Sequence, residues 1–252
     1  MLAYRLRYYT GIVTYLLFVT VHYFIWQAIF YGRPVGTEIH GFTLREMVTY
    51  VTVGWISRSF YFSDIDYDMD EIVRTGQVSM YLLRPVNFQL MMIAQAIGGT
   101  LFRGIFFTAP VAVLPLILFD VLPPQGVGNF LLFCFSTLTA FLILAQLNFI
   151  IGLLAFSFKS ITGVIHAKYY VIQLFSGLLL PLSFFPEWAQ TILHALPFKT
   201  ITYVPLQFYL GHVSPEQIPL VVFNQIFWIV ALAALGHYLW YRAFSELTLQ
   251  GG

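Results

Sequence analysis

Long runs of mostly apolar residues, separated by short polar stretches, follow one another along the chain. They cover approximately residues 10–31, 44–62, 98–119, 129–157, 164–185 and 218–241. Each run has close to the roughly 20 residues that a helix needs to cross the hydrocarbon core of a bilayer. None shows the alternation of apolar and polar residues that is typical of outer-membrane β-strands. The pattern therefore predicts an all-α integral membrane protein with six transmembrane helices.

The apolar run around the third predicted span is longer than a bilayer requires. It extends from Val86 to Phe119, and about 34 helical residues would cover about 51 Å at a rise of 1.5 Å per residue. The pair Gly98-Gly99 offers a natural break. We therefore expect residues 86–97 to form an interfacial helix that leads into the span.

Composition supports a membrane protein and excludes several other classes. Hydrophobic residues make up 59% of the 252 residues and charged residues only 9%, whereas a soluble domain carries about 25% charged residues. This excludes a soluble enzyme, a nucleic-acid binder and a disordered chain. Because no internal repeat or composition break is visible, residues 1–252 are expected to form one transmembrane domain.

The positions of the basic residues indicate the orientation in the membrane. With a cytoplasmic N-terminus, the inner segments hold Arg5, Arg7, Arg74, Arg84, Lys159, Lys168 and Arg242, and the outer segments hold Arg33, Arg45 and Lys199. Cytoplasmic loops carry the excess of Lys and Arg. The count predicts a multi-pass protein of the cell (inner) membrane with both termini in the cytoplasm. Arg58 and Arg103 fall within predicted spans, and we expect them to extend toward the cytoplasmic edge.

The predicted cytoplasmic loop at residues 63–85 carries an unusual concentration of acidic residues. It contains Asp64, Asp66, Asp68, Asp70 and Glu71. Ser63 is a suitable N-cap, early carboxylates suit the positive end of a helix dipole, and Gly76 suits a left-handed C-terminal stop. We therefore predict a short helix over residues 64–75, after which Arg84-Pro85 closes the loop. It is either a solvated acidic loop or a docking helix for a cytoplasmic partner.

A calcium site of the EF-hand type does not fit this loop. Such a loop needs Gly at its sixth position and Glu at its twelfth. Counting from Asp64 places Met69 and Thr75 there, and counting from Asp66 places Glu71 and Gln77 there. Both registers fail.

The predicted external loop between the fifth and sixth runs is rich in proline and aromatic residues. Pro186 can start a short helix, in which Trp188, Ile192 and Leu196 would repeat every four residues on one face. Such a segment either re-enters the bundle, where protein satisfies its backbone, or forms an aromatic belt at the membrane interface. Both interpretations stay open.

The chain lacks the sequence motifs of several catalytic and transport mechanisms. It has no G-x-x-x-x-G-K-[ST], no G-x-S-x-G and no paired Cys or His at zinc spacing. No Asp or Glu falls near the middle of a predicted span, which disfavours ion-coupled transport. A stand-alone channel or secondary carrier remains the alternative. A membrane-embedded enzyme would depend on Gln146 and Asn148, which point in different directions on a helix.

Two loop motifs resemble those of a known family. Glu71-Ile72-x-Arg74-x-Gly76-x-Val78, followed by Leu82-Leu83-Arg84-Pro85-x-Asn87, resembles the signature of type-2 ABC transporter permeases, in particular their small six-span subfamily. The external segment Phe185-Pro186-Glu187-Trp188, with Leu196-Pro197-Phe198 and Tyr203-x-Pro205, is similar to that family's loop between spans five and six.

The resemblance implies the fold of a type-2 ABC exporter permease and the non-catalytic membrane half of an ATP-driven exporter. Its partners would be a second permease copy or a paralogous permease, the lipid bilayer, and separate ABC ATPase subunits that bind ATP and Mg; this chain would hold no cofactor or metal. Spans two and five would line the substrate path. The resemblance assigns coupling to the ATPase to Asp64, Asp66, Asp68, Asp70, Glu71, Arg74, Gly76, Arg84 and Pro85. It assigns the external re-entrant gate to Pro186, Glu187, Trp188, Pro197 and Pro205.

Overall fold

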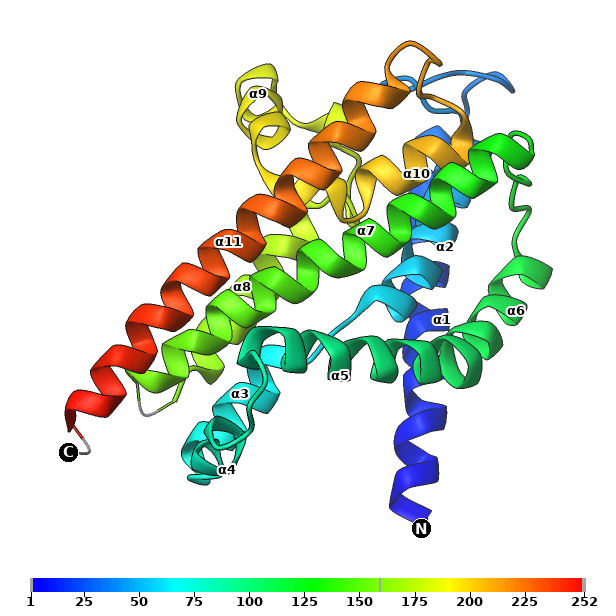
Figure 1. Ribbon diagram of the computed structural model, residues 1–252. Coiled ribbons are helices and arrows are strands. Elements are labelled where there is room, and N and C mark those ends of the chain that lie inside the picture. The colour runs from blue at the N-terminus through cyan, green and yellow to red at the C-terminus, as the bar shows by residue number, and fades with distance from the viewer. Residues whose placement is uncertain (1, 159, 251–252) are drawn as a thin grey trace.

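The protein, seen as a computed structural model that describes residues 2–158 and 160–250, is built from helices joined by short links (Figure 1). The α-helices are α1 (Leu2–Phe30), α2 (Leu44–Tyr61), α3 (Ile65–Arg74), α4 (Val78–Leu82), α5 (Phe88–Arg103), α6 (Ala109–Leu118), α7 (Val127–Gly152), α8 (Thr162–Phe175), α9 (Glu187–Ala195), α10 (Tyr203–Leu210) and α11 (Ile218–Gln250). The shorter turns are the π-helical η1 (Gly104–Thr108) and the 3-10 helices η2 (Leu153–Phe156), η3 (Leu182–Phe184) and η4 (Pro197–Thr200). The all-α prediction is confirmed.

The long helix α7 forms the centre of the fold. It packs against α11, α10, α3 and α2, and 67% of the most apolar stretch of α7–η2 is buried. Small residues on α7, such as Ser136, Ala140 and Ala145, are fully buried and let neighbouring backbones approach closely. The other helices are therefore arranged around α7.

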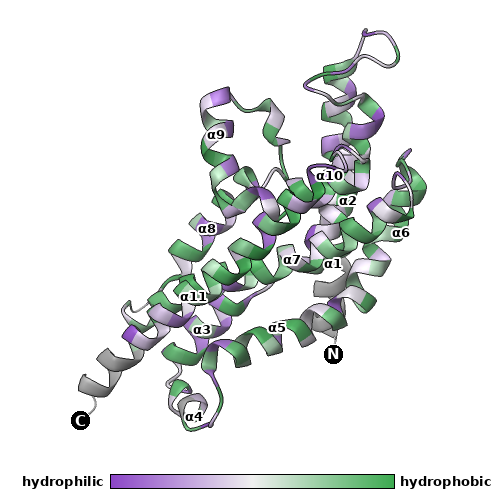
Figure 2. Ribbon diagram, turned by 45° about the horizontal axis from the view of Figure 1, so that its top comes forward, coloured by the Kyte–Doolittle hydropathy of each residue, from purple (hydrophilic) through white to green (hydrophobic). Residues whose placement is uncertain are grey.

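Four stretches of the described chain are long and apolar enough to cross a membrane. They are Thr10–Phe30, Phe88–Leu118, Val127–Phe156 and Ile218–Ala243. Outside α7, only 11% of each stretch is buried, and Figure 2 shows mainly hydrophobic residues along α5, α6 and α11. Apolar faces of this extent suit contact with lipid.

The chain does not break at Gly98-Gly99, so that expectation is wrong. Helix α5 runs through both glycines, and the bend comes at the π-helical η1, after which α6 continues in a new direction (Figure 1). A helix that faces lipid keeps its internal hydrogen bonds because no water can replace them, and π-turns are a known cause of helix bending. The long run does divide into two differently directed helices, but after Arg103.

Helix α2 matches the second predicted span but is enclosed by protein. Thirteen of its 18 residues are buried. It begins with a capping box, in which Thr43 accepts a hydrogen bond from the Glu46 backbone and the Glu46 carboxylate accepts one from the Thr43 N–H at 2.8 Å. Because Arg45, Glu46 and Arg58 make it less apolar, α2 is not one of the four stretches that are apolar enough to cross a membrane. A membrane-crossing role for α2 stays a prediction.

The fifth predicted span, 164–185, is not one continuous helix. Helix α8 ends at Phe175, and Gly177 has a φ of +89°, a left-handed conformation that a right-handed helix does not allow. The 14 residues of α8 cover only about 21 Å at 1.5 Å per residue, against a hydrocarbon core of about 30 Å. The chain then passes through η3 toward α9.

Different short segments lie at the two ends of the molecule. Helices α3 and α4 lie at the same end as the start of α1 and the end of α11 (Figure 1). Helix α9, the α1–α2 link and the α10–α11 link lie at the opposite end. The long helices therefore connect two separate groups of short segments.

Candidate functional site

Helix α3 carries apolar and polar residues on opposite faces, and its apolar face is buried. Ile65, Met69 and Ile72 are at most 7% exposed and belong to the same core as Phe149 of α7. Their spacing of three and four residues places them on one side of a helix. The sequence thus folds residues 65–74 into a helix that lies against the end of α7.

The contact between α3 and α7 depends on a residue without a side chain. A Cβ atom at Gly152 would lie 2.6 Å from the Met69 sulfur, 3.1 Å from the Met69 Cβ and 3.3 Å from the Asp66 Cα. Since the last two atoms belong to or adjoin the backbone of α3, they cannot move independently of the helix. Glycine therefore sets how closely α3 approaches α7.

A buried polar network joins α3 to the rest of the protein. Asp66 is 0% exposed and forms an ion pair with Lys168 of α8. Lys168 Nζ also donates to Asn148 Oδ1 at 2.6 Å, and Asn148 Nδ2 donates to the Ser63 carbonyl at 2.7 Å. The network therefore ties α3, α7, α8 and the α2–α3 link to one another.

A second contact ties α3 to the α7–α8 link. The Asp70 carboxylate accepts a hydrogen bond from the Ile161 N–H at 3.2 Å. Beside it, Ile161 and Ile165 are buried in a small apolar cluster that includes Val73. The first half of α3 is therefore attached to the middle of α8 through Lys168, and its second half to the residues at which α8 begins.

The five acidic residues assigned to coupling lie in different surroundings. Asp66 is buried and Asp70 points into a contact within the chain, so neither carboxylate is presented to a partner. Asp64 is half-buried and lies 3.7 Å from Arg103. Of the five acidic residues, only Asp68 and Glu71 are exposed, and Arg74 is exposed on the same helix.

The outward face keeps a local excess of negative charge. Partial desolvation, followed by the charges of Asp64, Glu71 and Asp66, raises the pKa of the Asp68 carboxyl above its ordinary value. A carboxylate in such a field is stabilised by an approaching cation. The exposed side of α3 is thus suited to a basic surface.

The ends of α3 agree only in part with the sequence. Gly76 has a φ of +73°, and its N–H donates to the Val73 carbonyl at 3.1 Å, which confirms the left-handed stop. The Ser63 cap is wrong: Asp64 occupies the N-cap without a side-chain hydrogen bond. The Ser63 carbonyl is instead used by Asn148.

The loop beyond Gly76 forms an additional short helix that the sequence did not indicate. In α4 and the following link, Met80 and Leu83 are 61% and 85% exposed, and Arg84 and Pro85 are also exposed. The Arg84 guanidinium lies 5.1 Å from the centre of the Tyr81 ring. Helix α4 lies beside α3 at the end of the molecule (Figure 1), so these residues extend the same surface.

At the opposite end, the proline-rich segment separates into an exposed and a buried part. Pro186 is the N-cap of α9 rather than its first helical residue; Glu187 is exposed and Trp188 is 71% exposed. Pro197 begins η4 and is buried, and Pro205 lies within the buried α10. The chain therefore turns back into the helical body after α9, and the role of this segment as an external gate stays a prediction.

Helix α10 packs between α2 and α7, and hydrogen bonds near its two ends join it to α2, to the end of α8 and to the α6–α7 link. Tyr61 and Thr202 hydroxyls lie 2.7 Å apart, and Thr202 donates to Ser176 at 3.1 Å. The Tyr209 hydroxyl donates to the Leu122 carbonyl at 3.0 Å. These bonds satisfy polar groups that would otherwise be buried unpaired.

Sequence reasoning missed the two residues that position the site, Lys168 and Asn148. Their only signal is that each is a strongly polar residue inside an apolar run, and such residues are expensive unless paired. Gln146, two residues before Asn148, accepts a hydrogen bond from Gln89 of α5 at 2.7 Å. The two amides therefore belong to separate contacts.

Comparison with known proteins gives one result. The sequence model of a family described as ABC-2 family transporter protein matches residues 16–251. No curated protein and no solved structure matches the chain. The match covers nearly all of the chain, including both groups of short segments.

Proposed function

The chain belongs to the ABC-2 family of transporter proteins, and from this premise we propose that it is the permease subunit of an ATP-driven exporter in the cell membrane. In this proposal ATP and Mg bind to separate ABC ATPase subunits, which dock on the surface formed by the outward side of α3 and by α4. The permease itself carries out no catalysis.

The observation that carries the proposal is the attachment of α3. Its inward side is fixed by the Asp66–Lys168–Asn148 network and by the close approach at Gly152, while Asp68 and Glu71 remain exposed. A short helix held in this way transmits a displacement to α7 and α8 instead of absorbing it. This is the mechanical property that coupling to a separate ATPase requires.

The arrangement of the two ends supports an orientation with both termini in the cytoplasm. The start of α1, the end of α11 and the α3–α4 surface lie together (Figure 1), and the excess of basic residues favours this end as the cytoplasmic one. Helix α9 and the re-entrant α10 would then lie at the external end, where they form the outer gate.

A second permease copy or a paralogous permease completes the exporter in this proposal. Exposed apolar side chains on α8, such as Tyr170 and Val171 at 67% and 40% exposure, suit a contact with another apolar surface. Helix α2 is largely enclosed within one chain. It would therefore contact a substrate path between two permeases only through the few side chains near its cytoplasmic end, such as Trp55 and Arg58, that line a cavity.

Charge reversal tests the coupling surface. The permease is co-expressed with an ATPase that purifies with it, and Glu71→Lys is compared with Glu216→Lys, an exposed acid beyond α10 at the opposite end. We expect Glu71→Lys to weaken association and reduce stimulated ATP hydrolysis, more so at low salt, and Glu216→Lys to leave both unchanged. Equal behaviour of the two variants would remove the coupling role.

The alternative, a stand-alone channel or carrier, predicts that the permease transports solute without ATP or a partner, and a second assay tests this. The purified permease alone is placed in liposomes, and solute release is measured without ATP. The proposal expects no transport above that of empty liposomes. Transport by the permease alone would establish the alternative.

A further inference from the structure

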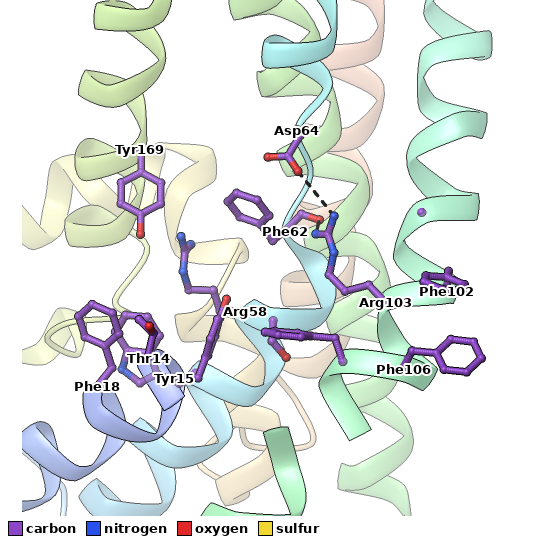
Figure 3. Close-up of a pocket in the computed structure, with 14 residues that line it drawn as sticks. Thr14, Tyr15, Phe18, Arg58, Phe62, Asp64, Phe102, Arg103, Phe106 and Tyr169 are labelled. Atoms are coloured by element: carbon purple, nitrogen blue, oxygen red, sulfur yellow. Dashed lines mark hydrogen bonds and ion pairs between the residues drawn. The ribbon is translucent and has the colours of Figure 1, made fainter. Parts of the chain in front are cut away.

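A cavity of about 700 Å³ opens on the side of the protein near the α2–α3 link. Its walls come from α1, α2, the link to α3, α5, η1 and α8 (Figure 3). Most of the lining side chains are aromatic, but two arginines, Arg58 and Arg103, also line it. The cavity belongs neither to the α3–α4 surface nor to the re-entrant segment.

Arg58 is a buried cation directed into this cavity. Its residue is only 6% exposed, and its guanidinium carbon lies 4.8 Å from the centre of the Tyr169 ring and 5.5 Å from that of Phe62. Within residues 2–158 and 160–250, no carboxylate forms an ion pair with it. Aromatic faces stabilise a cation only in part, and a buried charge favours an opposite charge nearby.

Arg103 approaches the same ring from the other side. Its guanidinium carbon lies 5.4 Å from the centre of Phe62, and it contacts the Asp64 carboxylate at 3.7 Å and the Phe62 carbonyl. Figure 3 shows the two arginines on either side of Phe62, with Asp64 beside Arg103. Two guanidiniums and one carboxylate leave the cavity with one excess positive charge.

The rim of the cavity is apolar and continuous with a lipid-facing helix. Phe102 and Phe106 are 66% and 54% exposed, and their ring centres lie 4.6 Å apart with the ring planes tilted by 36°. Both lie in the apolar stretch Phe88–Leu118 that is long enough to cross a membrane. A molecule with its head at Arg58 would therefore extend its apolar part along α5 and η1.

We infer that this cavity binds the head group of an acidic phospholipid from the surrounding bilayer. Arg58 holds the phosphate, since a planar guanidinium matches phosphate oxygens, and the acyl chains lie against Phe102 and Phe106. The depth fits this ligand, because Arg58 lies in the last turn of α2, immediately before the polar α2–α3 link. The inference rests on membrane immersion and does not depend on coupling to an ATPase.

Lipid binding to the purified full-length protein tests the inference by native mass spectrometry in detergent. The probes are dioctanoyl phosphatidylglycerol, dioctanoyl phosphatidylcholine and inorganic phosphate. We expect phosphatidylglycerol to bind at least about tenfold more tightly than phosphatidylcholine, because the choline cation of the zwitterionic lipid offsets the attraction between its phosphate and the excess positive charge of the cavity. Inorganic phosphate at the same concentration should not displace the lipid, since it lacks the apolar contacts.

Two pairs of variants test separately the contact with the lipid head group and the contact with the acyl chains. Arg58→Gln should weaken phosphatidylglycerol binding about tenfold, whereas Arg45→Gln, at the other end of α2, should not. Phe106→Ala, an exposed position whose change should not affect folding, should also weaken binding, and Phe130→Ala at the start of α7 should not. Unchanged binding in both Arg58→Gln and Phe106→Ala, equal binding of the two lipids, or displacement by inorganic phosphate would each overturn the inference.

Discussion

Helices α3 and α9 are both short amphipathic segments, of ten and nine residues, at opposite ends of the molecule, yet they are attached differently. Helix α3 buries Ile65, Met69, Ile72 and the charged Asp66. Helix α9 buries only Leu193, and its Gln190 bonds locally to the Phe185 carbonyl at 2.7 Å. Amphipathic patterning alone therefore does not say whether a helix is fixed; the partners contributed by distant segments decide it.

The difference has a functional meaning under the proposed role. A helix that receives force from another protein needs contacts that resist rotation and translation, and a buried ion pair with defined geometry supplies both. A helix at the membrane surface needs only an apolar side, which Trp188 and Ile192 provide at 71% and 54% exposure. The comparison predicts that equivalent changes cost more in α3 than in α9.

Breaking the buried ion pair should have the largest effect. Lys168→Met leaves the Asp66 carboxylate buried without its cation, and removal of one partner of a buried pair costs about 3–5 kcal/mol. The matched control is Arg45→Met, which removes an exposed pair with Asp120 and should shift the melting temperature far less, because exposed ion pairs contribute little to stability. Thermal unfolding in detergent measures both. Similar melting shifts in the two variants would show that the Asp66–Lys168 pair does not hold α3.

Truncation of one apolar side chain in each helix tests the comparison directly. Met69 in α3 is 0% exposed, so Met69→Ala should destabilise by about 2–5 kcal/mol. Ile192→Ala in α9 should change stability by no more than about 0.5 kcal/mol, since it is an exposed position. Urea or thermal unfolding with an intrinsic fluorescence signal gives both values. An equal loss would contradict the difference in attachment.

Filling the space at Gly152 should push α3 away from α7. The added methyl of Gly152→Ala meets Met69 and the Asp66 backbone, and overpacking of this kind costs about 1–3 kcal/mol. In the control Gly163→Ala, the added Cβ meets no atom within 4 Å, and the better helix propensity of Ala makes this change neutral or stabilising by up to about 1 kcal/mol. Opposite signs in the two melting shifts are the expected result; matching signs would count against close packing.

We expect the smallest effect from Asp68, whose protonation makes the stability of the protein depend on pH. Desolvation and neighbouring acids raise its pKa above the ordinary 3.8, so the folded protein binds this proton more tightly than the unfolded chain. The associated stability is complete below 3.8 and is lost as the pH rises through the raised value. Asp68→Asn should therefore become increasingly stable relative to the wild type over that window. A difference that stays constant with pH would show that the pKa is not raised.

Much of the fold followed from the apolar pattern because long helices need little more than length and hydropathy. The pattern places the starts of α7 and α11 within two residues, but it places the end of α7 five residues too late and the end of α11 nine residues too early. It also predicts Gly76 as the stop of α3. The break at Gly98-Gly99 was wrong because lipid-facing helices retain their hydrogen bonds. The end of α8 was missed because the left-handed Gly177 looks like any other glycine in an apolar run.

The candidate site was less predictable than the fold. The acidic cluster predicts the short helix α3, but not that Asp66 faces inward, where it pairs with Lys168, 102 residues further along the chain. Such a pairing depends on how α3 and α8 pack and cannot be read from local spacing. The same is true of Arg58, which was expected to extend to the membrane edge and is instead buried among Trp55, Phe62 and Tyr169.

The central claim is that the outward side of α3 contacts the ATPase, and site-specific photo-crosslinking tests it most directly. A photo-crosslinking amino acid is placed at position 71 and, in a separate protein, at position 216, and membranes that contain the complex are illuminated. The account predicts a crosslinked product of the permease and the ATPase from position 71 and none from position 216. Absence of that product at position 71, or its equal formation at position 216, would contradict the account.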